Sequence, residues 1–210
     1  MRRRQVATTV STKPVLESGD RLTRDEFHRR YCALPDIKKA ELVEGVVYVG
    51  SPVRFDAHGE PHGQIVGWLA VYCAKHPEAR FGDNATVLLD AMNELQPDAC
   101  LWRREPTGPH LDDKGYLEGA PQLVVEIAAS SASYDLHDKK EAYRRNGVRE
   151  YVVWRVLDEA VDWLRLEDGA YVRVEPSARG LIESATFPGL RLNVPKLLAG
   201  DLAAVLRAVR

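Results

Sequence analysis

Three charged residues stand out in the sequence because they interrupt otherwise apolar segments: Asp98, Glu126 and Lys139. Glu126 lies within the strand-like run LVVEIA (residues 123–128), where losing the partner of a buried carboxylate would cost roughly 3 to 5 kcal/mol. Two carboxylates and a lysine in one cleft suit metal-assisted hydrolysis, because Mg²⁺ takes oxygen ligands, commonly one or two protein carboxylates. The metal polarises a phosphoryl group, and the lysine orients water or stabilises the developing charge.

The local periodicity of the chain predicts that these side chains converge. Strand alternation places Glu126 on one face with Val124 and Ala128. In the following helix, about 100° per residue turns Lys139 toward the apolar arc and leaves its neighbours Lys140, Arg144 and Arg145 outside it. Asp98 follows a proline at the start of another strand. Singly, each residue is more simply explained by a structural ion pair or a turn cap, but together they favour a site.

The elements that must position this group alternate between helices and strands. The pattern predicts helices over 22–35, from near Pro61, over 136–146 and over 195–209, and strands at 85–90, 97–102, 122–128 and 149–154. Hairpins are expected to turn at Glu44-Gly45 and at Asp168-Gly169, and Thr23 with Glu26 is expected to form a capping box. The later elements are expected to extend one sheet.

Composition limits the class of protein. The chain has 210 residues, of which 45% are hydrophobic and 29% charged, enough for one core. We expect a flexible tail over residues 1–19 and a single domain over 20–210. No apolar stretch approaches the ~20 residues needed to cross a bilayer. The three cysteines are odd in number and widely spaced, which indicates neither a disulfide framework nor a zinc ribbon and favours the cytoplasm.

The net charge argues against a general affinity for nucleic acid. Lys and Arg number 29 against 31 Asp and Glu, which gives a formal charge of −2 and a pI near 6.3. Binding to DNA would therefore require a local basic patch, and the sequence has one candidate over residues 139–149, which includes Lys140, Arg144 and Arg145.

Several other site motifs are excluded. HGEPH (58–62) has a proline and a misplaced glutamate, so it does not match the zinc-binding H-E-x-x-H helix. The sequence contains no phosphate-binding G-x-x-x-x-G-K-[ST] loop, no dinucleotide-binding G-x-G-x-x-G motif and no G-x-S-x-G elbow.

The ordered set of motifs resembles the Uma-type restriction endonucleases, a family in the PD-(D/E)XK nuclease superfamily. The matching stretches are ELVEG (41–45), His62, QPDA (96–99), GAPQLVVEI (119–127), DLHDKKEAYRRNGVREY (135–151) and FPGL (187–190). They follow the family's order across about residues 20–195.

The resemblance implies a restriction-endonuclease-like α/β fold, a mixed central sheet flanked by helices with an added C-terminal β-hairpin and helix. It implies that Asp98 and Glu126 ligate Mg²⁺, or Mn²⁺ in its place. The lysine of the usual E-x-K motif is absent, because Ala128 stands there, and Lys139 from the next helix is expected to replace it. The expected accessory residues near the metal are Glu41, Glu44 and His62.

The function that follows is a metal-dependent endonuclease acting on DNA phosphodiester bonds, with Lys139 orienting the attacking water. Lys140, Arg144 and Arg145 are expected to contact the DNA, no membrane partner is expected, and a homodimer is a possible assembly. The alternative is a catalytically degenerate nuclease-fold module that binds DNA or protein. The intact acidic pair and lysine favour the enzyme, whereas the near-neutral charge keeps the alternative open.

Overall fold

The computed structural model describes residues 15–129 and 134–210 and is a mixed α/β fold. Within these residues, the strands form two six-stranded sheets and one two-stranded sheet. Sheet A has the order β2-β1-β5-β4-β8-β7, with β1 (Ala40–Val43), β2 (Val46–Val49), β4 (Val87–Asp90), β5 (Asn93–Leu95), β7 (His110–Leu111) and β8 (Leu117–Glu118). Sheet B has the order β12-β11-β10-β9-β6-β3, with β3 (Ala79–Asp83), β6 (Ala99–Arg103), β9 (Leu123–Ala128), β10 (Glu150–Arg155), β11 (Ala160–Glu167) and β12 (Ala170–Arg173). The short pair is β13 (Leu181–Glu183) and β14 (Arg191–Asn193).

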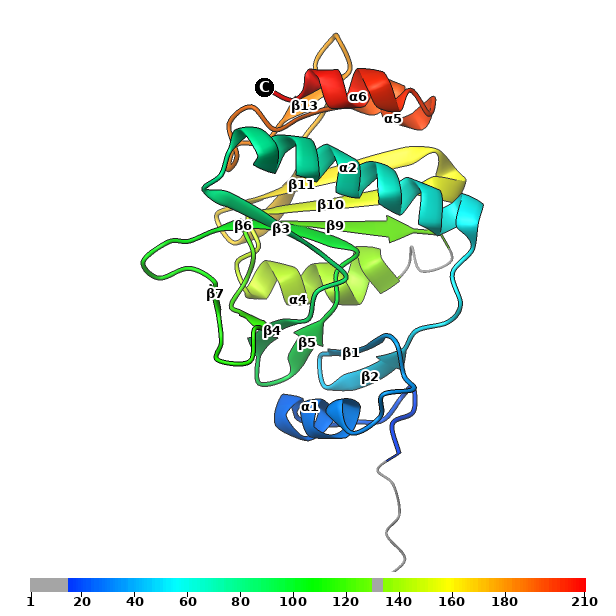
Figure 1. Cartoon of the computed structure of the whole chain (residues 1–210), viewed down its shortest axis with the longest axis vertical. Helices are drawn as coiled ribbons and strands as arrows, with labels where there is room; N and C mark the ends of the chain where they lie inside the picture. Colours follow the sequence, from blue (N-terminus) through cyan, green and yellow to red (C-terminus); the bar gives the residue numbers. More distant parts are fainter. Residues whose placement is uncertain (1–14, 130–133) are drawn as a thin grey trace, which may run out of the picture.

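Helices cover both faces of sheet B (Figure 1). The α-helices are α1 (Arg24–Cys32), α2 (Glu60–Lys75), α4 (Lys140–Arg145), α5 (Val194–Leu198) and α6 (Leu202–Ala208). Shorter helical turns are the π-helical η1 (Phe55–Gly59) and η2 (Asp135–Lys139) and the 3₁₀ turn η3 (Val156–Asp158). Figure 1 shows α2 on one side of the sheet and α4 on the other, with the C-terminal helices beyond α2.

Strand β9 lies inside sheet B and is paired on both edges. It runs parallel to β10, and a parallel pair requires a crossover connection, which η2 and α4 provide. On its other edge β9 pairs antiparallel with β6. All six residues of β9 are buried, so the charge of Glu126 lies in the middle of the sheet.

Alternation along β9 divides the core between the two helical layers. Val125 and Ile127 join the cluster that contains Trp68 of α2, whereas Val124 joins the cluster that contains Tyr143 of α4. Glu126 follows the alternation of Val124 and therefore faces the α4 layer, as the sequence predicted.

Several local predictions are confirmed. Both expected hairpins form, and their turn residues have the positive φ angles of type I′ turns, at 51° and 74° for Glu44 and Gly45 and at 48° and 80° for Asp168 and Gly169. The hairpin of β11 and β12 extends sheet B, as expected.

Other local predictions are wrong. The strand expected at 85–90 forms as β4, but the strands do not extend one sheet: β4 belongs to sheet A, and β13 with β14 forms a separate pair. The closing helix is divided into α5 and α6 around Gly200, whose φ of 72° ends the first helix. The capping box does not form: Thr23 makes no side-chain cap, and the Glu26 carboxylate binds Arg29 and Arg30.

The chain before α1 packs against sheet A. Leu16 is buried, and the Gly19 N–H donates to the carbonyl of Val47 at 2.8 Å. Residues 15–19 of the expected tail are thus part of the fold, while residues 1–14 lie outside the described residues. Among the described helices, none has the length and apolar character needed to cross a membrane.

Candidate active site

The pairing of β6 with β9 brings the two predicted carboxylates together. Ala99 is paired with Val125, so Asp98, just before β6, lies beside Glu126. Asp98 Oδ2 accepts the N–H of Ile127 at 2.8 Å, and the Asp98 N–H reaches Glu126 Oε2 at 3.4 Å. Because both carboxylates are anchored to strand backbone, the sheet itself determines their separation.

Lys139 reaches the same place from the end of η2. Its Nζ lies 3.1 Å from Glu126 Oε1 and 2.9 Å from Glu41 Oε2, with Asp135 Oδ1 at 3.6 Å. The Tyr143 hydroxyl also donates to Glu126 Oε1, at 2.9 Å. The structure therefore brings Asp98, Glu126 and Lys139 together and adds contacts from both sheets.

The three accessory residues have different positions. Glu41 of β1 contacts Lys139 and accepts the N–H of Gln96 through Oε1 at 2.8 Å. His62 Nε2 lies 2.8 Å from the Asp98 carbonyl oxygen and 2.9 Å from Asp83 Oδ1, behind Asp98. Glu44 does not join this group, because it lies at the β1–β2 turn and pairs with Arg145.

Sequence reasoning missed two cationic or titratable contacts of Asp98. Lys39 Nζ lies 2.9 Å from Asp98 Oδ1, and His58 Nε2 lies 3.5 Å from the same oxygen. The sequence spacing could have indicated both residues. Lys39 lies two positions before Glu41, so the two share one face of an extended segment, and His58 precedes His62 by one helical turn. The rings of His58 and His62 do lie close together, with their centroids 5.7 Å apart.

Burial and neighbouring charges shift these groups in opposite directions. Burial raises the pKa of Glu126 to about 8; Lys139 opposes this shift, whereas nearby acids add to it: Asp98, Asp135 and Glu41. Burial also disfavours the charged form of Asp98, but Lys39, His58 and Lys139 hold its pKa below the usual range. Despite burial, the adjacent carboxylates hold the pKa of Lys139 well above its ordinary value. The cluster thus combines an aspartate and a lysine whose charged forms are favoured by their neighbours with a glutamate whose neutral form is favoured by burial.

This cluster forms the wall of a cavity of about 330 Å³. The charged groups that line it include Lys39, Glu41, Arg54, His58, Asp98, Glu126, Asp135 and Lys139. Apolar side chains from Val53 and Leu157 complete the wall, and both are exposed. A solvent-derived nucleophile and a polar substrate group could therefore meet beside the carboxylates.

The donor atoms fit a hard divalent cation with few protein ligands. Within residues 15–129 and 134–210, no three His, Cys, Asp or Glu side chains are grouped as a ready metal site. Of the four carboxylates that line the cavity, Asp98 and Glu126 lie side by side, and among the described residues Glu126 Oε2 has only the long contact with the Asp98 N–H. Mg²⁺ commonly uses one or two carboxylates and keeps waters at its other positions, so this donor set suits it.

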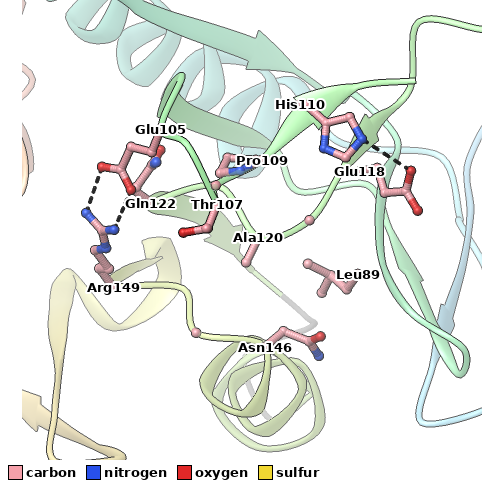
Figure 2. Close-up of a pocket in the computed structure, with 13 residues that line it drawn as sticks. Leu89, Glu105, Thr107, Pro109, His110, Glu118, Ala120, Gln122, Asn146 and Arg149 are labelled. Carbon is pink, nitrogen blue, oxygen red and sulfur yellow. Dashed lines mark hydrogen bonds and ion pairs between the residues drawn. The ribbon is translucent and has the colours of Figure 1, made fainter. Parts of the chain in front are cut away.

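A larger cavity, of about 490 Å³, lies at the opposite end of α4 (Figure 2). Its charged side chains are engaged with each other: Arg149 Nη1 lies 3.0 Å from Glu105 Oε1, and His110 Nε2 lies 3.6 Å from Glu118 Oε2. None of the predicted catalytic residues lines it. The three predicted catalytic residues line the smaller cavity instead.

The predicted basic patch on α4 is largely occupied by contacts within the protein. Arg144 Nε donates to Glu141 Oε2 at 2.9 Å, and its Nη1 donates to the Gly169 carbonyl at 2.5 Å. Arg145 pairs with Glu44. Neither arginine lines the cavity, and neither does Lys140, which begins α4.

The structure is a mixed α/β fold in which the sheet presents two carboxylates to a lysine from the crossover connection. The family model described as Uma2, putative restriction endonuclease, matches residues 24–195, and the chain belongs to this family. The crystal structure of a putative nuclease of DUF820 from Anabaena variabilis ATCC 29413 is similar, with a TM-score of 0.64 at 16% sequence identity. The match covers 85% of this chain and 98% of that chain and shows the shared fold. No curated protein matches the sequence.

Proposed function

We propose that this protein is a metal-dependent endonuclease that hydrolyses DNA phosphodiester bonds at Asp98, Glu126 and Lys139. The observation that supports the proposal is the convergence of all three side chains on one cavity, from the residue before β6, from β9 and from the end of η2. Membership in a family described as restriction endonucleases supports DNA as the substrate.

In this proposal Asp98 and Glu126 hold Mg²⁺, or Mn²⁺ in its place. The bound metal would polarise the phosphoryl group and lower the pKa of a water molecule. Lys139 contacts Glu126 through Oε1, which leaves Oε2 for a cation. The ammonium of Lys139 would orient the attacking water and stabilise the negative charge that develops on the phosphoryl oxygens.

The neighbouring residues act as positioning groups. Glu41 contacts the Lys139 ammonium at 2.9 Å, in addition to the contact of Lys139 with Glu126. His62 holds the backbone of Asp98 through its carbonyl oxygen, at 2.8 Å. Substitution of either residue would therefore alter the placement of a catalytic group without removing it.

DNA would approach the cavity from solvent, and Lys140, Arg144 and Arg145 would contact its phosphates along α4. The present partners of the two arginines, Glu141 and Glu44, are exposed, and such surface pairs contribute little, about 0 to 1 kcal/mol. A phosphate could therefore replace them. Binding would weaken with salt as the phosphates release counterions.

The test is cleavage of supercoiled plasmid DNA with Mg²⁺, with Mn²⁺ and with EDTA. We expect cleavage by the parent protein with either metal, none with EDTA, and a loss of roughly 10²-fold or more in Asp98→Asn. Asp201→Asn is the matched control, because it makes the same charge change at the N-cap of α6, where asparagine caps equally well. DNA that is bound but not cut under every condition would contradict the proposal and favour the degenerate binding module.

A further inference from the structure

The cation closest to Asp98 is Lys39, and the predicted catalytic group does not include it. Its ammonium lies 2.9 Å from Asp98 Oδ1. The other carboxylate oxygen, Oδ2, is used by the N–H of Ile127. Asp98 Oδ1 is therefore the carboxylate oxygen that binds no backbone N–H, and Lys39 contacts it more closely than His58, whose Nε2 lies at 3.5 Å.

Lys39 and Lys139 differ in how firmly they are held. The Lys139 side chain is 4% exposed and has three carboxylates around it. The Lys39 side chain is 30% exposed and has one carboxylate, Asp98, with Asn84 Oδ1 at 3.2 Å as its other contact. Lysine has a flexible four-carbon stem, so Lys39 can leave Asp98 by rotation at the cavity wall.

We propose that Lys39 competes with the divalent cation for Asp98 Oδ1, so that metal binding displaces the Lys39 ammonium from this carboxylate. This inference rests on the proposed function. Two cations that share one carboxylate oxygen repel each other strongly, and the better-buried Lys139 contacts Glu126 Oε1. The more exposed lysine is therefore the one that moves.

Displacement gives Lys39 a second role as a positioning residue. Its stem begins at the residue before β1 and lines the cavity. Once displaced, the Lys39 ammonium would pair with another anion at the cavity wall. In the proposed reaction that anion is the substrate phosphate. Lys39 would thus lower the metal affinity of the free protein and contact the substrate once the metal is bound.

The alternative is that Lys39 only neutralises Asp98 and keeps its carboxylate in place. Removal of the lysine would then disturb the carboxylate, and metal binding would weaken or stay unchanged. The competition account makes the opposite prediction, because loss of the competing cation should tighten metal binding. An opposing charge within 4 to 6 Å typically shifts a carboxylate equilibrium by roughly tenfold to a thousandfold.

The experiment is calorimetric titration of Mg²⁺ into the parent protein, Lys39→Met and Lys39→Gln. We expect both variants to bind Mg²⁺ at least roughly tenfold more tightly than the parent. The glutamine variant keeps a hydrogen-bond donor for Asp98 and separates the loss of charge from the loss of that bond. Lys38→Met is the matched control, since Lys38 is exposed and donates to the Pro35 carbonyl at 3.3 Å. It should bind Mg²⁺ like the parent.

The outcomes separate this inference from the proposed function. If the parent binds Mg²⁺ and both Lys39 variants bind it with equal or weaker affinity, the inference alone is overturned. The inference is also overturned if Lys38→Met gains as much Mg²⁺ affinity as the Lys39 variants. Absence of Mg²⁺ binding in the parent and in every variant would overturn the proposed function together with the inference. Binding by the Lys39 variants but not by the parent would support competition in its strongest form.

Discussion

Glu41 Oε2 lies 2.9 Å from Lys139 Nζ, closer than Glu126 Oε1 at 3.1 Å. Glu41 belongs to β1 of sheet A, whereas Glu126 belongs to β9 of sheet B. The proposed catalytic lysine thus joins the two sheets at the cavity. Its position depends on a residue that precedes it by almost a hundred positions in the chain.

Glu41→Gln should destabilise the fold measurably. Glutamine can still accept the N–H of Gln96, but the buried ion pair with Lys139 is lost while Glu126 remains as its partner. We expect a loss of about 1 to 3 kcal/mol in the free energy of unfolding by urea. Glu44→Gln, which removes an exposed pair with Arg145, should cost under about 1 kcal/mol. Equal effects of the two substitutions would mean that Glu41 does not hold Lys139.

Two tyrosines beside the cluster provide a matched pair of substitutions. Tyr143→Phe removes the hydroxyl that donates to Glu126 Oε1, and we expect it to cost about 1.5 to 3 kcal/mol. The Tyr134 hydroxyl is buried without a hydrogen-bond partner among the described residues, while its ring lies over Lys139 at 5.4 Å. Tyr134→Phe keeps the ring, so its melting temperature should equal or slightly exceed that of the parent. The reverse order of stabilities would contradict the contacts described for Glu126.

The raised pKa of Glu126 makes stability depend on pH. Burial raises this pKa from 4.5 to about 8, so the fold favours the neutral carboxyl group. The resulting stabilisation is complete below the unfolded pKa and is lost as the pH rises through about 8. In EDTA, the free energy of unfolding should fall by an amount on the order of a few kcal/mol between about pH 5 and pH 9. Glu126→Gln should show a flatter profile, and parallel profiles would exclude Glu126 as the titrating group.

Lys139→Met should reduce both stability and cleavage. Methionine removes the positive charge among the three surrounding carboxylates, and breaking a buried ion pair costs roughly 3 to 5 kcal/mol. Cleavage, measured well below the melting temperature, should fall by roughly 10²-fold or more. Lys140→Met is the matched control, because Lys140 is the next residue and does not line the cavity. It should change neither the stability nor the cleavage rate much. Cleavage at the parent rate by Lys139→Met would refute the assigned role.

Contacts that depend on local periodicity could be predicted from the sequence. Alternation in β9 and the helical arc after it placed Glu126 opposite Lys139, and these relationships depend on only a few successive residues. The hairpin turns were predictable for the same reason, since Glu44-Gly45 and Asp168-Gly169 require positive φ angles locally.

Contacts between distant segments could not be predicted in this way. The pairing of Lys39 with Asp98 depends on how sheet A packs against sheet B, which no local pattern specifies. The capping box predicted for Thr23 and Glu26 also failed, because the Glu26 carboxylate binds two arginines rather than the backbone at the start of its helix. The family resemblance supplied Glu41 and Glu44 as accessory residues. Glu41 contacts Lys139 in the structure, whereas Glu44 lies at a left-handed position of the turn and pairs with Arg145.

The most direct test of the central claim is Mg²⁺-dependent DNA cleavage by Glu126→Gln. The parent fold already favours a neutral group here, and glutamine keeps oxygen and size, so the variant should melt close to the parent while losing a metal ligand. Glu183→Gln is the control, because it removes an exposed carboxylate that pairs with Arg191 far from the cavity. We expect cleavage to fall by roughly 10²-fold or more in Glu126→Gln and to stay unchanged in Glu183→Gln. A folded Glu126→Gln protein that cleaves DNA at the parent rate would contradict the proposed role of Glu126.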